Sequence, residues 1–199
     1  MRRIAALAFV LLALATACAE RDDPTVTQPG GPAEETSAEP TPEEPAELPG
    51  ASCESVNAGN PSNFPDFTAV KLESNEGIDR ITFLFEPEAG APEEPPLHFV
   101  NFTDQLTTDG EGAPVEVDGE AFLVVSFQAV GVDLSGEQPV PVYTGPKRFT
   151  PEFETLREVV HLGDFEGQVS WGLGLSHEAC FVVDATPEQL TLEFAAAAD

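Results

Sequence analysis

Apolar residues recur at every second position along most of the chain after residue 66. This spacing places them on one face of an extended strand and is typical of β-sheets with one buried side. In residues 168–175, an apolar face alternates with a face made of Gln168, Ser170 and two glycines. The apolar face consists of Val169, Trp171, Leu173 and Leu175. Because the other face is nearly bare, we expect another segment of the chain to approach it closely.

Similar runs predict the other strands, and turn residues separate them. The predicted strands lie at 70–72, 81–85, 97–102, 122–127, 159–162, 179–183 and 190–194, with a shorter one at 114–117. The run 122–127 is apolar on both faces, as expected for a strand in the centre of a sheet. Ser176-His177-Glu178 interrupts the pattern and predicts a hairpin with a short loop. About eight short antiparallel strands predict an all-β fold, either a β-sandwich or an open barrel.

The segments between the strands have a different composition. Residues 86–96 are rich in proline, glutamate and glycine and predict a loop, as do residues 132–138. Residues 140–149 form an irregular segment that carries the domain's only adjacent cations. Residues 152–158 predict one or two turns of helix, and no longer helical period occurs. The helical content is therefore expected to be very small.

The chain has 199 residues and a formal net charge of -28. Five cations occur after residue 50, and they are Lys71, Arg80, Lys147, Arg148 and Arg157. Such an acidic surface repels nucleic acid and anionic lipid headgroups, so neither is an expected partner. Acidity of this kind favours solubility in a salty or extracellular setting over a dedicated cation site.

The first residues predict export from the cell. Met1-Arg2-Arg3 is basic, residues 4–14 are apolar, and small residues precede Cys18. This order is typical of a signal peptide over residues 1–17, and the apolar run is shorter than the roughly 20 residues that span a bilayer. Cys18 resembles the lipid-attachment cysteine of bacterial lipoproteins, and the alternative is ordinary cleavage near Ala17. Lipidation with two or more acyl chains would anchor the chain at the outer face of the cell membrane.

Residues 18–50 form the next unit. They contain seven prolines among acidic and small polar residues, with almost nothing large and apolar. Such a segment buries too little surface to offset the entropy of ordering, so we expect a disordered, acidic tether. It would hold the following domain, residues 51–199, roughly 30 to 100 Å from the membrane.

Two cysteines, Cys53 and Cys180, remain after Cys18. In exported proteins two remaining cysteines most often pair, so we expect a structural disulfide rather than a redox or metal site. The bond would join the segment ahead of the first strand to the late hairpin predicted around residues 176–178.

Four short motifs resemble those of a known family when they are taken in order. They are Phe64-Pro65-Asp66-Phe67, Gly77-Ile78-Asp79-Arg80, Tyr143-Thr144-Gly145-Pro146, and Gly163-Asp164-Phe165-Glu166-Gly167 followed by Trp171-Gly172-Leu173-Gly174. They resemble the AMIN-like domain of actinobacterial exported proteins and lipoproteins over residues 64–195. The resemblance implies a β-sandwich in the cell envelope, related to AMIN domains that localise amidases and secretins by contacting the wall. It implies no catalytic residues.

The residues themselves predict no catalysis, metal or cofactor. His98, His161 and His177 are far apart and lack the spacing of a zinc site. No serine lies in a nucleophile motif, and acids are too frequent for one pair to be singled out as a glycosidase pair. Residues 109–112 lack the calcium-loop ligand series, so a solvated turn is favoured.

One candidate ligand-binding surface combines Tyr143, Lys147 and Arg148. Its cations would hold a polar or anionic ligand, such as a glycan or a peptide carboxylate. Trp171 is expected in the core, although stacking on a sugar ring is the alternative.

The sequence therefore predicts a lipid-anchored, non-catalytic β domain that binds a cell-wall component or an envelope protein. One alternative is an adaptor or scaffold whose partner is another protein. The other is a hydrolase of wall polymers, which would require a pair of acids facing a concave pocket.

Replacing Cys18 with serine removes the sulfur that would carry the lipid. We expect the Cys18→Ser chain to leave the membrane fraction, because an unlipidated chain has no acyl anchor. Cell fractionation measures this, with Cys180→Ser as a control that loses a cysteine elsewhere. Continued membrane association of the Cys18→Ser chain would contradict lipidation.

Overall fold

The computed structural model describes residues 48–196, and these residues form an all-β fold without a helix. The strands are β1 (Val56–Ala58), β2 (Asp66–Asn75), β3 (Ile78–Glu86), β4 (His98–Thr103), β5 (Ala121–Gln128), β6 (Val132–Asp133), β7 (Val140–Pro141), β8 (Arg148–Phe149), β9 (Leu156–Phe165), β10 (Gln168–Leu175), β11 (Phe181–Ala185) and β12 (Gln189–Ala195). The predicted signal peptide, Cys18 and most of the predicted tether lie outside the described residues. No helix long and apolar enough to cross a membrane occurs between residues 48 and 196.

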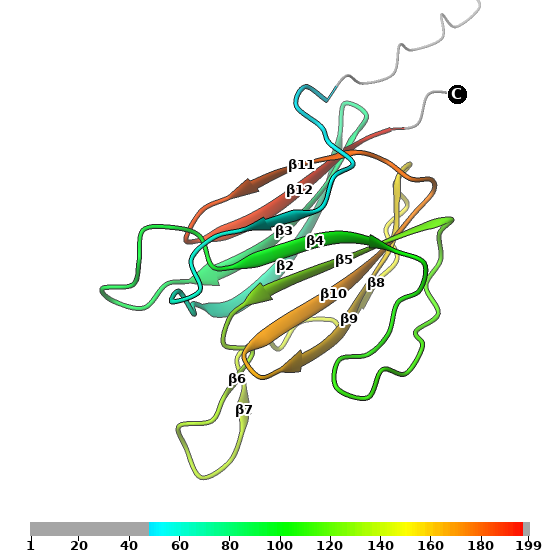
Figure 1. Ribbon diagram of the computed structural model, residues 1–199. Coiled ribbons are helices and arrows are strands. Elements are labelled where there is room, and N and C mark those ends of the chain that lie inside the picture. Colours follow the sequence, from blue (N-terminus) through cyan, green and yellow to red (C-terminus); the bar gives the residue numbers. More distant parts are fainter. Residues whose placement is uncertain (1–47, 197–199) are drawn as a thin grey trace, which may run out of the picture. The chain divides into compact units, whose positions relative to one another are not determined.

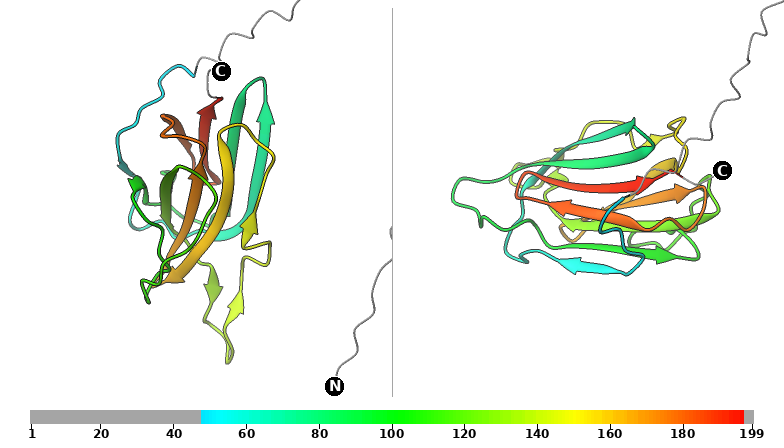
Figure 2. Two further views of the ribbon diagram at one scale, coloured as in Figure 1. Left: turned by 90° about the vertical axis from the view of Figure 1, so that its right-hand side faces the viewer. Right: turned by 90° about the horizontal axis from the view of Figure 1, so that it is seen from above.

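The strands form two antiparallel sheets that face each other, as the side view in Figure 2 shows. One sheet has six strands in the order β1-β4-β5-β10-β9-β8, and the other has four in the order β11-β12-β3-β2 (Figure 1). The short strands β6 and β7 form a separate hairpin. The fold is therefore a β-sandwich. The doubly apolar run 122–127 lies in β5, inside the larger sheet, as predicted.

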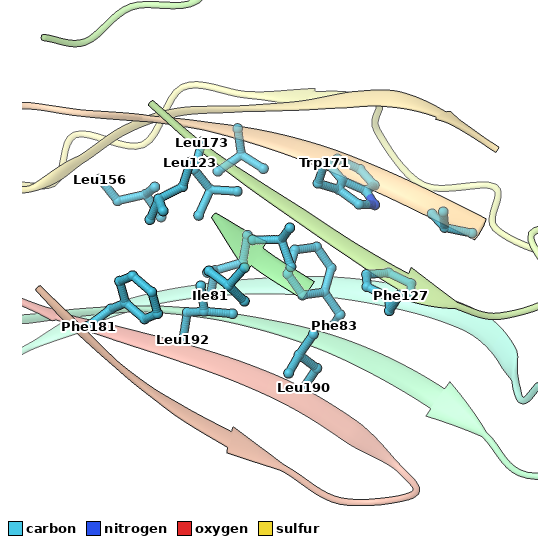
Figure 3. Close-up of a cluster of buried hydrophobic side chains, with 14 of the residues drawn as sticks. Ile81, Phe83, Leu123, Phe127, Leu156, Trp171, Leu173, Phe181, Leu190 and Leu192 are labelled. Carbon is cyan, nitrogen blue, oxygen red and sulfur yellow. The ribbon is translucent and has the colours of Figure 1, made fainter. Parts of the chain in front are cut away.

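The inner faces of the two sheets meet in an aromatic core (Figure 3). Trp171 on β10 is fully buried and lies edge-on to Phe67 and Tyr143, with ring centroids 6.1 and 5.7 Å away. Side chains of the smaller sheet, among them Ile81 and Leu192, face it from the opposite layer. Each fully buried aliphatic or phenylalanine side chain contributes about 1.5–3 kcal/mol. Trp171 is thus a core residue, as predicted.

The bare face of β10 is covered by another segment, as predicted. The side chain of Leu106 lies over Gly172, where a Cβ atom would be 2.7 Å from it. The backbone of Asp118 lies over Gly174, where a Cβ atom would collide with the Asp118 carbonyl oxygen. The two glycines therefore allow the 104–118 segment to pack directly on the outer face of the larger sheet.

The hairpin predicted at Ser176-His177-Glu178 is wrong. β10 belongs to the six-stranded sheet and β11 to the four-stranded sheet, so this segment is a crossover between layers. The backbone N–H of Ser176 donates to Thr155 O at 2.9 Å, and β11 then pairs with β12. The alternation of apolar residues predicts that both segments are strands, which is confirmed, but it carries no information about which sheet each strand joins.

Two other local predictions are also wrong, and a third is wrong in part. Residues 152–158 form no helix. The strand β9 begins at Leu156, and the backbone N–H groups of Thr155 and Leu156 donate to the carboxylate of Asp79, which is far away in the sequence. Residues 114–117 form no strand but only an isolated bridge between Thr107 and Pro114. Within the predicted loop 132–138, Val132 and Asp133 form β6.

A buried carboxylate joins the two sheets. Asp79 on β3 is 1 % exposed and accepts the backbone N–H groups of Thr155 at 2.7 Å and Leu156 at 2.9 Å. The hydroxyl of Thr155 donates to the carbonyl oxygen of Ala195 on β12 at 2.8 Å. The carbonyl of Thr155 accepts Ser176 N–H, so one residue ties the start of β9 to the smaller sheet and to the crossover.

The predicted disulfide between Cys53 and Cys180 is confirmed. It joins residues 127 positions apart and fixes the segment before β1 to the crossover before β11. A backbone bridge between Ser52 and Phe181 lies beside it.

Replacing Asp79 with alanine leaves two buried backbone N–H groups without an acceptor. Hydrogen bonds to charged groups contribute about 1.5–3 kcal/mol each, so we expect the free energy of unfolding to fall by about 3 kcal/mol or more. Asp184→Ala removes an exposed carboxylate from β11 and should change it by less than about 0.5 kcal/mol. Chemical denaturation measures both, and equal stability of the two variants would contradict the role of Asp79.

The double variant Cys53→Ser, Cys180→Ser removes a cross-link that closes a very long loop. Chain entropy puts its contribution at up to about 5 kcal/mol, so the denaturation midpoint should fall markedly. The unreduced wild-type chain supplies the control, since its mass should show no free thiol at these two positions. A mass that shows two free thiols at these positions would contradict the disulfide.

Candidate functional site

A groove of about 770 Å³ opens where the loop before β9 meets the β10–β11 crossover. We call it the polar groove. Its lining residues come from three separate segments of the chain. They are Asp118, Thr150, Pro151, Glu152, Phe153, Glu154, Arg157, Ser176 and His177.

The first wall is the loop between β8 and β9. The ring of Phe153 is half-buried against the sandwich core and anchors this loop. Two residues further on, Thr155 is fully buried and held by Asp79. The guanidinium of Arg157 donates from Nη1 to the Phe153 carbonyl at 3.0 Å, and its side chain stays exposed.

The second wall is the start of the crossover. Ser176 is placed by its backbone hydrogen bond to Thr155. The hydroxyl oxygen of Ser176 lies 2.9 Å from Nδ1 of His177. The hydrogen bonds of residues 48–196 give His177 no carboxylate partner, so nothing there orients it as the base of a catalytic triad.

The third side is Asp118, whose position depends on Arg148. Oε2 of the buried Glu158 accepts the backbone N–H of Asp118 at 2.6 Å, and its Oε1 pairs with Arg148. Arg148 also donates from Nη2 to the carbonyl oxygen of Glu116 at 3.2 Å. Arg148 therefore helps to hold the rim of the polar groove through its pairing with Glu158, although its side chain is 47 % exposed.

The polar groove offers both donors and acceptors. The carboxylates of Asp118, Glu152 and Glu154 accept hydrogen bonds from hydroxyl, amide or ammonium groups. Arg157 has no ion pair within the described part of the chain and is able to bind a carboxylate through two parallel hydrogen bonds. The groove thus suits a polar ligand that carries groups of both charges.

The model of the AMIN-like domain family matches residues 65–196. The chain belongs to the AMIN-like domain family. Searches of the curated proteins and of the solved structures give no significant match. The whole polar groove lies within the matched residues, whereas Cys53 precedes them.

Within the AMIN-like domain, Tyr143 is not on the surface. It is 8 % exposed, its ring stacks on Phe67 with centroids 4.7 Å apart, and its hydroxyl donates to the Pro146 carbonyl at 2.6 Å. Burial raises the pKa of this hydroxyl. Tyr143 therefore offers no exposed ring to a ligand, and its hydrogen bond shapes the turn that leads to β8.

Lys147 is exposed, and a ligand role for it stays a prediction. Its carbonyl accepts the N–H of His161 at 2.8 Å, and it does not line the polar groove. Burial lowers the pKa of His161, and the charge of Lys147 lowers that pKa further. Burial also raises the pKa of Asp164, and the charge of Asp109 raises it again.

The residues of the AMIN-like domain that line the groove were not singled out by the sequence. Arg157 and His177 lie outside any motif, and the three acids are ordinary members of a very acidic chain. Only the folded loops bring residues 118, 152–157 and 176–177 together. In the described range, no three His, Cys, Asp or Glu side chains are grouped closely enough to hold a metal ion.

Proposed function

We propose that this AMIN-like domain is a non-catalytic module that binds a cell-wall component, and that the polar groove is its binding site. Membership of the family supports an association with the cell envelope and its wall. The observation that carries the choice of site is Arg157, an exposed cation without an ion pair among the described residues, placed in a groove with three carboxylates.

The chemistry of wall glycopeptides matches this lining. Such polymers present carboxylates, ammonium groups and many hydroxyls within a short distance of one another. Arg157 would bind a carboxylate, and the acids would accept hydrogen bonds from hydroxyl and ammonium groups. The net charge of -28 disfavours nucleic acid, because phosphates would be repelled over the whole surface.

The proposal places the domain outside the cell. The Cys53–Cys180 disulfide supports export, because disulfides persist in oxidising compartments. A lipid on Cys18 and an acidic tether over residues 18–50 would hold the domain at the outer face of the membrane, within reach of the wall.

A hydrolase of wall polymers is the second candidate, because Asp118, Glu152 and Glu154 face one groove. A glycosidase requires two acids that flank the scissile bond within one groove. An adaptor that binds an envelope protein is the remaining alternative. The same experiment separates all three.

The full chain carrying Cys18→Ser is incubated with purified peptidoglycan sacculi, and the bound fraction is measured as a function of concentration. Arg157→Ala should raise the apparent Kd by about tenfold or more, because a charge-assisted hydrogen-bonded pair is lost. Lys71→Ala is the matched control, since it removes an equally exposed cation from β2 on the other sheet.

Three other results have defined meanings. Equal binding of the Arg157→Ala and Lys71→Ala chains would exclude the polar groove as the site. If the chain with an unsubstituted groove does not bind sacculi, the wall is excluded as the ligand and the adaptor function is favoured. Release of soluble fragments from dye-labelled sacculi, lost in Glu152→Gln, would establish the hydrolase instead.

A further inference from the structure

The strand β11 is an edge strand that residues 48–196 pair with on its outer side at one position, Phe181. Ser52 N–H donates to the Phe181 carbonyl at 2.9 Å, and Phe181 N–H donates to the Ser52 carbonyl at 3.1 Å. In an antiparallel ladder, backbone groups of successive residues point to opposite sides. Val183 and Ala185 therefore point their N–H and C=O groups to the same side as Phe181, away from β12.

The covering segment leaves this edge immediately. Ala51 N–H donates to the Leu48 carbonyl at 3.2 Å and closes a turn at which Gly50 has a φ of 85°. The segment therefore makes one bridge to β11 and does not continue along it. Beyond the β11–β12 ladder, the backbone groups of Val183 and Ala185 have no hydrogen-bond partner in residues 48–196.

A second groove, of about 440 Å³, runs along the same edge. We call it the seam groove, because it lies between β11 and β1, the edge strands of the two opposing sheets. Its lining combines polar residues with an apolar part. The polar residues are Ser52, Glu54, Ser55 and His98, and the apolar part includes Val56, Ala58, Pro95, Phe181, Val183 and Ala185.

The side chains in this groove face inward but are incompletely covered. Phe181 is 3 % exposed, whereas Val183 and Ala185 on the same face of β11 are only half-buried. The sandwich thus has an open seam where unpaired backbone and apolar side chains occur together.

We propose that an extended, basic segment of a partner protein adds to β11 as a further strand. Its backbone would pair with Val183 and Ala185, and alternate apolar side chains would enter the seam groove. Asp184 is the exposed charge of β11 and points to the face opposite that of Val183 and Ala185, so lysine or arginine at the intervening positions would lie beside it.

Charge also argues against a second copy as the occupant. Pairing β11 with β11 of another chain would bring two Asp184 carboxylates close together, in a protein with a net charge of -28. Like charges across a strand pair are destabilising. This inference is independent of the polar groove, because the two grooves share no lining residue.

The test uses the full Cys18→Ser chain and a synthetic six-residue peptide in which lysine and valine alternate, capped at both ends. Fluorescence anisotropy measures the Kd, and hydrogen exchange measures protection of the Val183 and Ala185 amides. Two N-methylated peptides, each methylated at one set of alternate residues, serve as further probes. Alternate N–H groups of an extended peptide point to opposite sides, so only one of the two sets can face β11. The peptide that is methylated at that set should lose at least about tenfold in affinity, and the other should bind unchanged.

Variants of the chain test the edge and its charge separately. Val183→Pro removes the N–H group with which the peptide would pair, so it should abolish binding. Proline is tolerated on an edge strand where the N–H faces outward, so thermal unfolding of this variant should show that the fold is retained. Asp184→Lys should weaken binding about threefold to tenfold. Glu73→Lys, with the same charge change on the opposite edge strand β2, is its control.

The expected result is selective loss with one methylated peptide, together with slowed exchange at Val183 and Ala185. Equal affinity of both methylated peptides, or no binding at millimolar peptide, overturns strand addition. Equal effects of Asp184→Lys and Glu73→Lys overturn the charge argument. Concentration-dependent dimers that Val183→Pro dissolves would make a second copy the occupant and would also overturn the proposal.

Discussion

The hydrogen bonds between the Asp79 carboxylate and the backbone of Thr155 and Leu156 are the constraint on which the rest of the structure depends. They join β3 of the smaller sheet to the first residues of β9 in the larger sheet. A carboxylate that is 1 % exposed is stable in the interior only when it is hydrogen-bonded, and Oδ2 of Asp79 accepts both N–H groups, so these bonds hold the loop before β9 in place. That position sets the start of β9, the attachment of Ser176 and one wall of the polar groove.

The same constraint determines how the chain changes sheets. Ser176 directly follows β10, and its backbone N–H donates to the carbonyl of Thr155. The chain then crosses to the smaller sheet, where β11 pairs with β12. The disulfide holds this crossover at Cys180 and brings Cys53 and its neighbours to the edge of β11. Since β11 is the last strand of its sheet on that side, the crossover also produces the open seam.

The few cations of the domain have distinct roles. Arg80 pairs with Glu193 across β3 and β12, and Arg148 pairs with Glu158 to hold Asp118 at the groove rim. Arg157 is left to face the polar groove without a carboxylate partner in the described residues. In the proposed function, this arginine and the three acids that line the same groove would together bind a ligand of mixed charge.

The sequence by itself determined the β class, most strand positions, the buried Trp171, the close approach to the glycine face of β10 and the disulfide. These follow from period-2 alternation, from the absence of side chains at Gly172 and Gly174, and from the count of cysteines, all of which are local or compositional. Only the tertiary structure decided that residues 176–180 cross between sheets, that 152–155 form a loop, and that Tyr143 is buried. Each of these depends on a partner far away in the chain, namely β12, Asp79 and Phe67, and no local pattern reports the identity of a distant partner.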